Sequence, residues 1–320
     1  MKKKRIADAV APVVDLVLFV LVIPAAFLLK IVRRIGMARL RLTRAMLVRI
    51  GVLPIRDHYY EPFMSPRALR RPLDEERKLP GIDFRLPEQL KFLSTLVYEN
   101  ELAGLASASA KPGEYKLGNQ SFESGDAEFL YQIIRKTKPA RLYEIGSGHS
   151  TLIARAAVKK NCDEYSNYAC QHLCIEPYEA PWLEDIGVEV IRRRVEEVDS
   201  GIFSDLGKND MLFIDSSHVI RPQGDVVTEY LEILPILRSG VIVHVHDIFS
   251  PRDYPKEWIV DSMLLWNEQY LLEAFLTNND RWSIMAALNL LKHREFDAIK
   301  RVCPYLTKDR EPGSFYIQRN

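Results

Sequence analysis

Short apolar runs alternate with longer helical patterns over the second half of the chain. The runs cover residues 142–145, 173–175, 188–191, 210–215 and 241–247. Strands that alternate with helices predict a parallel sheet with helices on both faces, so we expect a doubly wound α/β fold. A polar stretch at 161–171 predicts a loop, and the apolar and aromatic spacing between Trp258 and Thr277 predicts one long helix.

The turn after the first run carries most of the candidate chemistry. Glu144 precedes Gly146 and Gly148 there, and glycines let the chain fold back sharply and let a ligand approach the main chain. In a doubly wound sheet this turn lies in the crevice where nucleotides bind. Thr151 stands where a dinucleotide-binding fingerprint would have its third glycine. The turn therefore predicts a nucleotide-like ligand held in another way.

Further motifs follow in order at residues 122–126, 138–139, 175–177, 213–218 and 244–249. Together with the glycine turn they resemble class I methyltransferases that depend on S-adenosylmethionine (SAM), of the methyltransferase domain 24 type. The resemblance covers roughly residues 118–320, and residues 313–317 are similar to the last, antiparallel strand of that fold. It implies a mostly parallel seven-stranded sheet, with SAM as the cofactor.

The resemblance also implies roles for single residues. The methionine part of SAM is expected against the turn, and its carboxylate at the start of the following helix, where free N–H groups favour an anion. Glu176 is expected at the ribose, and Val195 with Glu196 near the adenine. The expected cofactor-binding residues are Glu144, Gly146, Ser147, Gly148, His149, Ser150, Glu176 and Val195.

Methyl transfer needs a positioned nucleophile that loses its proton. Asp215, His218 and His246 are the expected catalytic residues, and two routes are open. In one, His218 or His246 is the general base, since histidine titrates near neutral pH. In the other, Asp215 and Asp247 bind Mg²⁺, which prefers oxygen ligands. The second arrangement is similar to that of catechol O-methyltransferase, although an isoleucine, residue 248, stands where that enzyme has an asparagine ligand.

The remaining histidines are given other roles. We expect His244 to be a buried core residue, and His172 and His293 to lie on the surface. The resulting expectation is O-methylation of a small, lipid-linked or glycan-linked hydroxyl. Two alternatives stay open, because one fold supports many chemistries: a hydroxylase-like metal-dependent enzyme, or a non-catalytic membrane-bound subunit that binds SAM.

The N-terminus has a different character from the rest of the chain. Residues 1–50 carry 11 of the 44 Lys/Arg but only 2 of the 43 Asp/Glu, which leaves them net +9 and the remainder net −8. An uncharged apolar stretch runs from Leu16 to Leu29 between basic flanks. We therefore expect a membrane-anchor segment at 1–50 with an apolar helix over about 9–32, bound to an anionic lipid surface as a spanning, re-entrant or surface helix.

The organisation that follows has three parts: the anchor, a proline-rich connector or cap at 51–117, and a SAM-binding domain at 118–320. The acidic remainder argues against nucleic acid as a partner. Four cysteines without a C-x-x-C pair suit a reducing compartment, so the catalytic domain is expected on the cytoplasmic side of the membrane.

Overall fold

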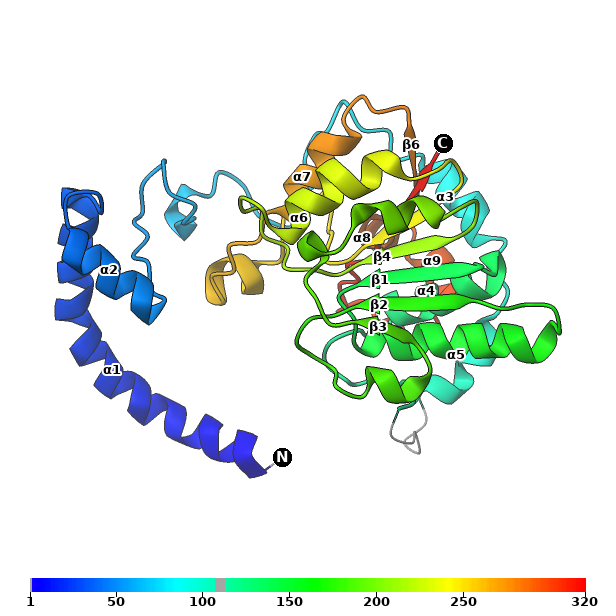
Figure 1. Ribbon diagram of the computed structural model, residues 1–320, viewed down its shortest axis with the longest axis horizontal. Coiled ribbons are helices and arrows are strands. Elements are labelled where there is room, and N and C mark those ends of the chain that lie inside the picture. Colours follow the sequence, from blue (N-terminus) through cyan, green and yellow to red (C-terminus); the bar gives the residue numbers. More distant parts are fainter. Residues whose placement is uncertain (1, 107–112) are drawn as a thin grey trace. The chain divides into compact units, whose positions relative to one another are not determined.

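Seven strands form one sheet in the order β3-β2-β1-β4-β5-β7-β6 (Figure 1). The computed structural model describes residues 2–106 and 113–320. The strands are β1 (Arg141–Ile145), β2 (Gln171–Ile175), β3 (Glu189–Ile191), β4 (Met211–Ile214), β5 (Ile242–Val245), β6 (Trp282–Ala287) and β7 (Phe315–Arg319). β1 to β5 pair in parallel, and β7 runs antiparallel to both β5 and β6. The doubly wound sheet and its antiparallel last strand are confirmed.

Helices cover both faces of this sheet, as Figure 1 shows for α5 on one face and for α6 and α7 on the other. In chain order the helices are α1 (Lys2–Ile35), α2 (Arg41–Ile50), α3 (Leu86–Leu93), α4 (Asp126–Thr137), α5 (His149–Glu164), α6 (Asp225–Thr228), α7 (Glu268–Leu276), α8 (Leu288–Arg294) and α9 (Phe296–Val302).

Period-two alternation along the strands divides the interior into two apolar cores. Met211 and Phe213 of β4 point into the core that α4, α5 and α9 cover, and Leu212 and Ile214 point into the core beneath α6 and α7. Parallel strands covered on both faces read as continuous apolar runs, which explains why β4 was visible in the sequence.

The chain divides into two compact units, Met1–Arg70 and Arg71–Asn320. In the second unit, α3 packs on β6 and α9, and the Gln89 side chain accepts a hydrogen bond from the Ala287 N–H at 2.8 Å. Part of the proline-rich segment therefore belongs to the second unit. The expected domain boundary at residue 118 stays a prediction.

Two local expectations are wrong. α5 continues to Glu164, so the loop expected from residue 161 begins later. The long helix expected between Trp258 and Thr277 is two elements, a π-helical turn at Glu257–Asp261 and the separate helix α7. The chain is interrupted at Met263, which has a left-handed φ of 53°, before Asn267 and Glu268 turn their N–H groups toward the carbonyl of His218.

In the first unit, α1 continues through Pro12 and Pro24. An 18-residue stretch within Val10–Ile35 has a mean hydropathy of 2.6 and none of it is buried in the structure, so by length and composition this helix can cross a membrane. At 1.5 Å per residue, 26 residues span about 39 Å, more than a hydrocarbon core of about 30 Å. The apolar helix is thus longer than the 9–32 expected.

Candidate functional site

Gly146 makes the turn between β1 and α5 possible. Its φ of +79° lies in the left-handed region, and a Cβ atom there would sit 1.8 Å from the backbone oxygen of Asp215. The Gly146 N–H bonds to Ile175 O at 3.0 Å, and the Asp215 N–H bonds to Ile145 O at 2.8 Å. The turn is therefore wedged between the ends of β2 and β4, and only glycine fits there.

A cavity of about 380 Å³ opens over this turn. The predicted residues Gly146, Ser147, Gly148, His149, Ser150, Glu176 and Asp215 line it, together with Ser121, Phe122, Glu179, Ala180 and Trp182. Its volume is within the range of small-molecule sites. The structure thus brings together most of the expected cofactor residues with the first expected catalytic residue.

The cavity has features that fit a nucleoside with a charged tail. A Cβ on Gly148 would meet nothing within 4 Å, so the main chain there is open to a ligand. The Glu176 carboxylate is fixed by the N–H groups of Tyr178 and Glu179, both at 2.8 Å, and by the Ser147 N–H at 3.3 Å. Open space and an oriented carboxylate therefore face the same cavity.

Glu144 does not line the cavity. Its side chain is buried on the α5 face of the sheet, where it accepts the Thr151 hydroxyl at 2.7 Å and contacts Nε2 of His172. Thr151 Oγ1 in turn accepts the Gly148 N–H at 3.1 Å. Glu144 therefore supports the glycine turn from below.

Two other expectations are corrected by burial. His172, expected at the surface, is buried because Glu144 pairs with it inside the sheet. Val195 is buried in the core beneath α6 and α7, outside the residues that line the cavity. His293 is partly exposed and lies 2.8 Å from Glu311.

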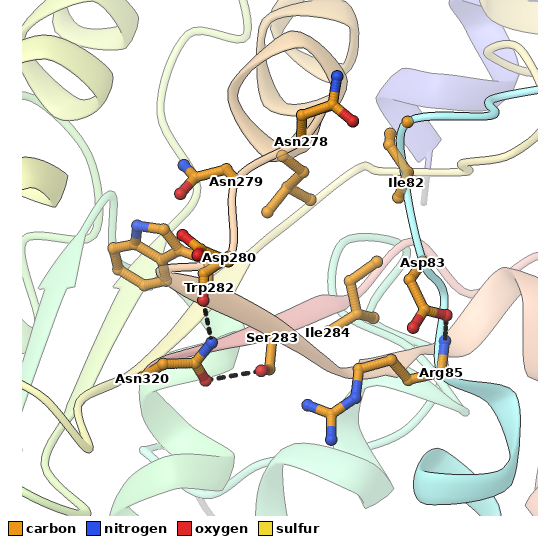
Figure 2. A pocket seen from close by; sticks show the side chains of 12 residues that line it. Ile82, Asp83, Arg85, Asn278, Asn279, Asp280, Trp282, Ser283, Ile284 and Asn320 are labelled. Carbon is orange, nitrogen blue, oxygen red and sulfur yellow. Dashed lines mark hydrogen bonds between the residues drawn. The ribbon is translucent and has the colours of Figure 1, made fainter.

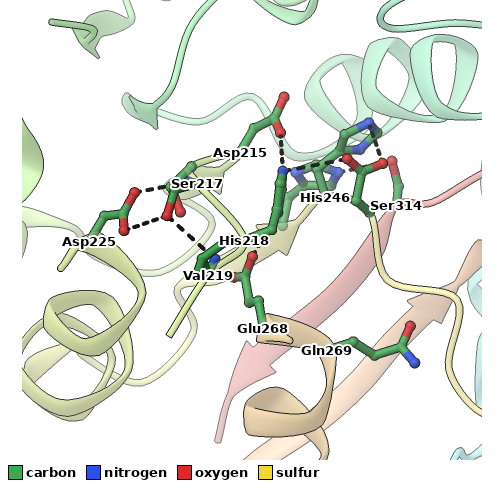
Figure 3. Close-up of polar contacts among 12 residues, drawn as sticks. Asp215, Ser217, His218, Val219, Asp225, His246, Glu268, Gln269 and Ser314 are labelled. Carbon is green, nitrogen blue, oxygen red and sulfur yellow. Dashed lines mark hydrogen bonds and ion pairs between the residues drawn. The ribbon is translucent and has the colours of Figure 1, made fainter. Parts of the chain in front are cut away.

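His218 connects the carboxylates at the ends of β4 and β5, as the contacts drawn in Figure 3 indicate. Its Nε2 lies 3.3 Å from Asp215 Oδ1 and 3.4 Å from Asp247 Oδ2. His218 and Asp247 both have left-handed φ values, of 59° and 58°. Such backbone conformations are unfavourable for non-glycine residues and gather at functional sites. Asp215, the most exposed of the three side chains, connects this cluster with the cavity.

The surrounding charges shift the pKa values of the cluster. Burial alone would lower the pKa of His218, but the carboxylates of Asp215 and Glu268 raise it well above 6.5. Burial raises the pKa of Asp247 to about 6 against the opposing effect of His246 and His218. For Asp215 the nearby histidines outweigh burial and lower the pKa to about 2. The arrangement favours a proton on His218 between ionised carboxylates.

His244 in β5 and His246 just after it have different surroundings. His246 Nε2 lies 3.5 Å from Asp247 Oδ1, and its ring is 5.0 Å from that of Phe122. The ring of His244 stacks on Phe213 at 4.1 Å, and its Nε2 lies 2.9 Å from Ser314 Oγ. Burial lowers the pKa of His244 well below its ordinary value. His244 is a neutral core residue, as expected, and His246 adjoins the cluster of Asp215, His218 and Asp247.

Magnesium fits this cluster poorly. The ligand atoms of Asp215, His218 and Asp247 lie within 4.8 Å of one another, but one of the three is a ring nitrogen, whereas Mg²⁺ prefers oxygen ligands. Mg²⁺ requires near-octahedral oxygen coordination at about 2.0–2.1 Å. Ile248, beside Asp247, is buried and offers no side-chain oxygen.

Sequence reasoning missed Trp182, Phe122 and Glu268. Trp182 follows the strand-end carboxylate Glu176 by six positions, and an aromatic residue in that loop was a usable signal. Phe122 lay in a recognised motif without a role. Glu268 gave no signal, because it was counted within a continuous helix.

A second cavity, of about 560 Å³, lies at the β6 edge of the sheet (Figure 2). The polar groups there bond largely with their neighbours: Ser283 Oγ donates to Asn320 Oδ1 at 2.6 Å, and the Arg85 N–H donates to Asp83 Oδ1 at 2.9 Å. The residues that line it include neither histidine nor cysteine. Its larger volume therefore does not make it the better candidate site.

The strand order, the glycine turn and the carboxylate at the end of β2 together define a class I SAM-dependent methyltransferase. A family model described as a methyltransferase domain matches residues 143–248. An uncharacterized protein of Archaeoglobus fulgidus is 30% identical over 166 residues, which are 48% of this chain and 73% of that protein. The chain belongs to this methyltransferase family and is a SAM-dependent methyltransferase.

An O-methyltransferase from Bacillus cereus, solved in complex with SAH, is 13% identical, with a TM-score of 0.36. The match covers 72% of this chain and 91% of that one.

Proposed function

We propose that this methyltransferase methylates a hydroxyl oxygen and that His218 is the base that removes the hydroxyl proton. The observation that carries the proposal is the position of the His218 ring, whose Nε2 faces Asp215 and Asp247 beside the cavity. A hydroxyl is a poor nucleophile until a base accepts its proton, and a base of raised pKa does so more readily.

Each residue of the cluster has its own role in the proposed reaction. Bound SAM supplies an electrophilic methyl group on a sulfonium. Asp215, which lines the cavity, orients the acceptor hydroxyl. His218 takes the proton on Nε2, and the imidazolium that forms lies beside the carboxylates of Asp215, Asp247 and Glu268. His246, near Asp247, keeps that carboxylate in place. Each contact stabilises the product of proton abstraction.

For the cofactor we propose a division of roles along the cavity. The N–H groups of His149 and Ser150 at the start of α5 bind the carboxylate of SAM. Glu176 accepts the ribose hydroxyls, and the ring of Trp182 packs against the adenine of SAM. Glu144 holds the turn through Thr151, without contact with the cofactor. We propose no cofactor contact for Val195.

We propose that the reaction proceeds without a divalent metal, since the His218 ring lies between Asp215 and Asp247 and becomes the cation there when it accepts the proton. Chelation with EDTA then leaves the rate unchanged. A tenfold loss that magnesium restores contradicts this part of the proposal.

We further propose that the acceptor is membrane-borne, lipid-linked or glycan-linked, and that α1 inserts in the bilayer. Residues Val10–Ile35 are long and apolar enough to span, and Lys30, Arg33 and Arg34 lie in the last part of α1. Three more arginines, Arg41, Arg44 and Arg49, lie on α2. Basic residues after a span favour the cytoplasmic side, where anionic lipids attract them by about 1 kcal/mol each. The second unit follows on that side.

The test uses the full-length protein in detergent with tritium-labelled SAM and a membrane lipid extract as acceptor. We expect label in the lipid fraction as a methyl ether. His218→Gln should lower the rate by about 10²- to 10⁴-fold while the Kd for SAM stays within about twofold. Methyl groups found on nitrogen, or an unchanged rate in the variant, contradict the proposal. Label found only in a water-soluble O-methylated product contradicts the membrane-borne acceptor alone.

A further inference from the structure

Glu268 is a buried carboxylate at the first residue of α7, and it lies 50 positions from the histidine that it contacts. Its Oε2 is 2.8 Å from His218 Nδ1, and its Oε1 accepts the Tyr230 hydroxyl at 3.2 Å. Its exposed fraction is 0%. A carboxylate this deeply buried is costly unless its oxygens are bonded, and both are.

The start of α7 also holds the backbone of His218. The N–H groups of Asn267 and Glu268 donate to His218 O at 2.9 and 3.2 Å, and Asn267 Oδ1 accepts the Ile220 N–H at 2.6 Å. The Trp266 ring lies 4.4 Å from the His218 ring. One short segment therefore fixes the main chain, the ring plane and one ring nitrogen of His218.

We propose that Glu268 is the positioning residue of this site: its carboxylate holds the proton of His218 on Nδ1, so that Nε2 is the free base that faces Asp215 and Asp247. A neutral imidazole carries its proton on one nitrogen only, and the hydrogen bond at the other nitrogen decides which. A carboxylate accepts but does not donate when ionised, so Nδ1 must be the donor.

This inference rests on His218 being the base of the proposed function, and it adds how that base is prepared. Without Glu268, Nε2 can keep the proton, because the carboxylates of Asp215 and Asp247 attract it to that nitrogen. A proton on Nε2 of a neutral ring leaves no lone pair toward the acceptor. Glu268 thus acts on the reaction through His218, without contact with substrate.

Glu229 offers a matched control. It is also a buried glutamate, adjoins Glu268 in the same core, and bonds to Ser216 Oγ at 3.2 Å. Burial and the charge of Glu268 raise its pKa well above the ordinary value, so a neutral glutamine is a close substitute. Among the described residues its side chain makes no hydrogen bond to His218, and only its charge acts on that ring.

The experiment is ring ¹H–¹⁵N NMR on the full-length chain in detergent, with ¹⁵N-labelled histidine and His218→Gln to assign the signals. Above the pKa of His218 we expect the Nδ1–H tautomer in the wild type and in Glu229→Gln. In Glu268→Gln we expect that pattern to be lost in favour of Nε2–H, and in Glu268→Asp to be kept in part.

SAM titration of the same samples separates the possible failures. A variant that binds SAM as the wild type does is folded, so its tautomer can be interpreted. An Nε2–H tautomer in the wild type, or an Nδ1–H tautomer that survives Glu268→Gln, overturns the inference and leaves SAM-dependent methylation intact. Absent SAM binding by the wild type counts against the proposed cofactor site instead.

Discussion

Gly146→Ala should lower the stability of the fold, whereas Gly148→Ala should weaken SAM binding. At Gly146 an alanine needs a left-handed φ, which costs about 1–2 kcal/mol for an L-residue, and its Cβ would sit 1.8 Å from Asp215 O. That contact is far inside van der Waals distance, so the ends of β1 and β4 must separate. The backbone strain of separating these strand ends costs about 1–3 kcal/mol more. The total is about 3 kcal/mol of lost stability.

For a unit the size of Arg71–Asn320, a loss of about 3 kcal/mol lowers the Tm by about 6–12 °C. Gly148→Ala is the matched control, because its Cβ meets nothing within 4 Å and its φ is −171°. It should melt like the wild type but place a methyl group where the cofactor binds, and weaken SAM binding at least tenfold, or about 1.4 kcal/mol. The assays are thermal melting and SAM calorimetry. A wild-type Tm for Gly146→Ala refutes the argument from the turn.

Three further outcomes follow from the same structure. Glu176→Ala should weaken SAM binding by about tenfold or more in calorimetry, because the ribose hydroxyls lose their acceptor; unchanged affinity would place the ribose elsewhere. The pH–rate profile should rise through a pKa above 6.5, since His218 accepts a proton only when neutral, and a rate that falls over this range would exclude it as the base. Aspartates at Leu18 and Leu21 each cost about 2.5–3.5 kcal/mol in a bilayer and should release the protein from membranes in carbonate extraction, whereas Leu231→Asp in the second unit should not.

The sequence predicted those parts of the fold whose signal is local. Each central parallel strand is an apolar run. The turn after β1 is marked by its glycines, which the left-handed backbone conformation favours. β6 was missed, because Trp282–Ala287 has no polar alternation and adjoins a helix. The break before α7 was missed as well. Its aromatic residues fit helical spacing, while the reason for the break, the bond of α7 to His218, is a contact across 50 positions.

The residues of the candidate site were likewise predictable only where their signal is local in the sequence. Glycines and strand-end carboxylates could be placed from the order of motifs, so Gly148, Glu176 and Asp215 were expected where they lie. Glu144 was given a cofactor contact because its position along β1 was known but the direction of its side chain was not. A strand alternates between faces, and Glu144 points to the α5 face, where Thr151 and His172 bind it. Partners of that kind cannot be read from spacing.

The charges of this carboxylate-rich cluster give a reason for proton transfer and methyl transfer to occur together in the proposed reaction. Asp215 lines the cavity proposed for SAM, so its negative charge would stabilise the sulfonium before transfer and would oppose the loss of that charge. A pair of unit charges 4 Å apart interacts by about 4 kcal/mol at an effective dielectric constant of 20. Proton transfer to His218 places a new positive charge 3.3 Å from Asp215 as the sulfonium charge disappears. The imidazolium therefore replaces the interaction that methyl transfer removes, and a base placed away from Asp215 would not.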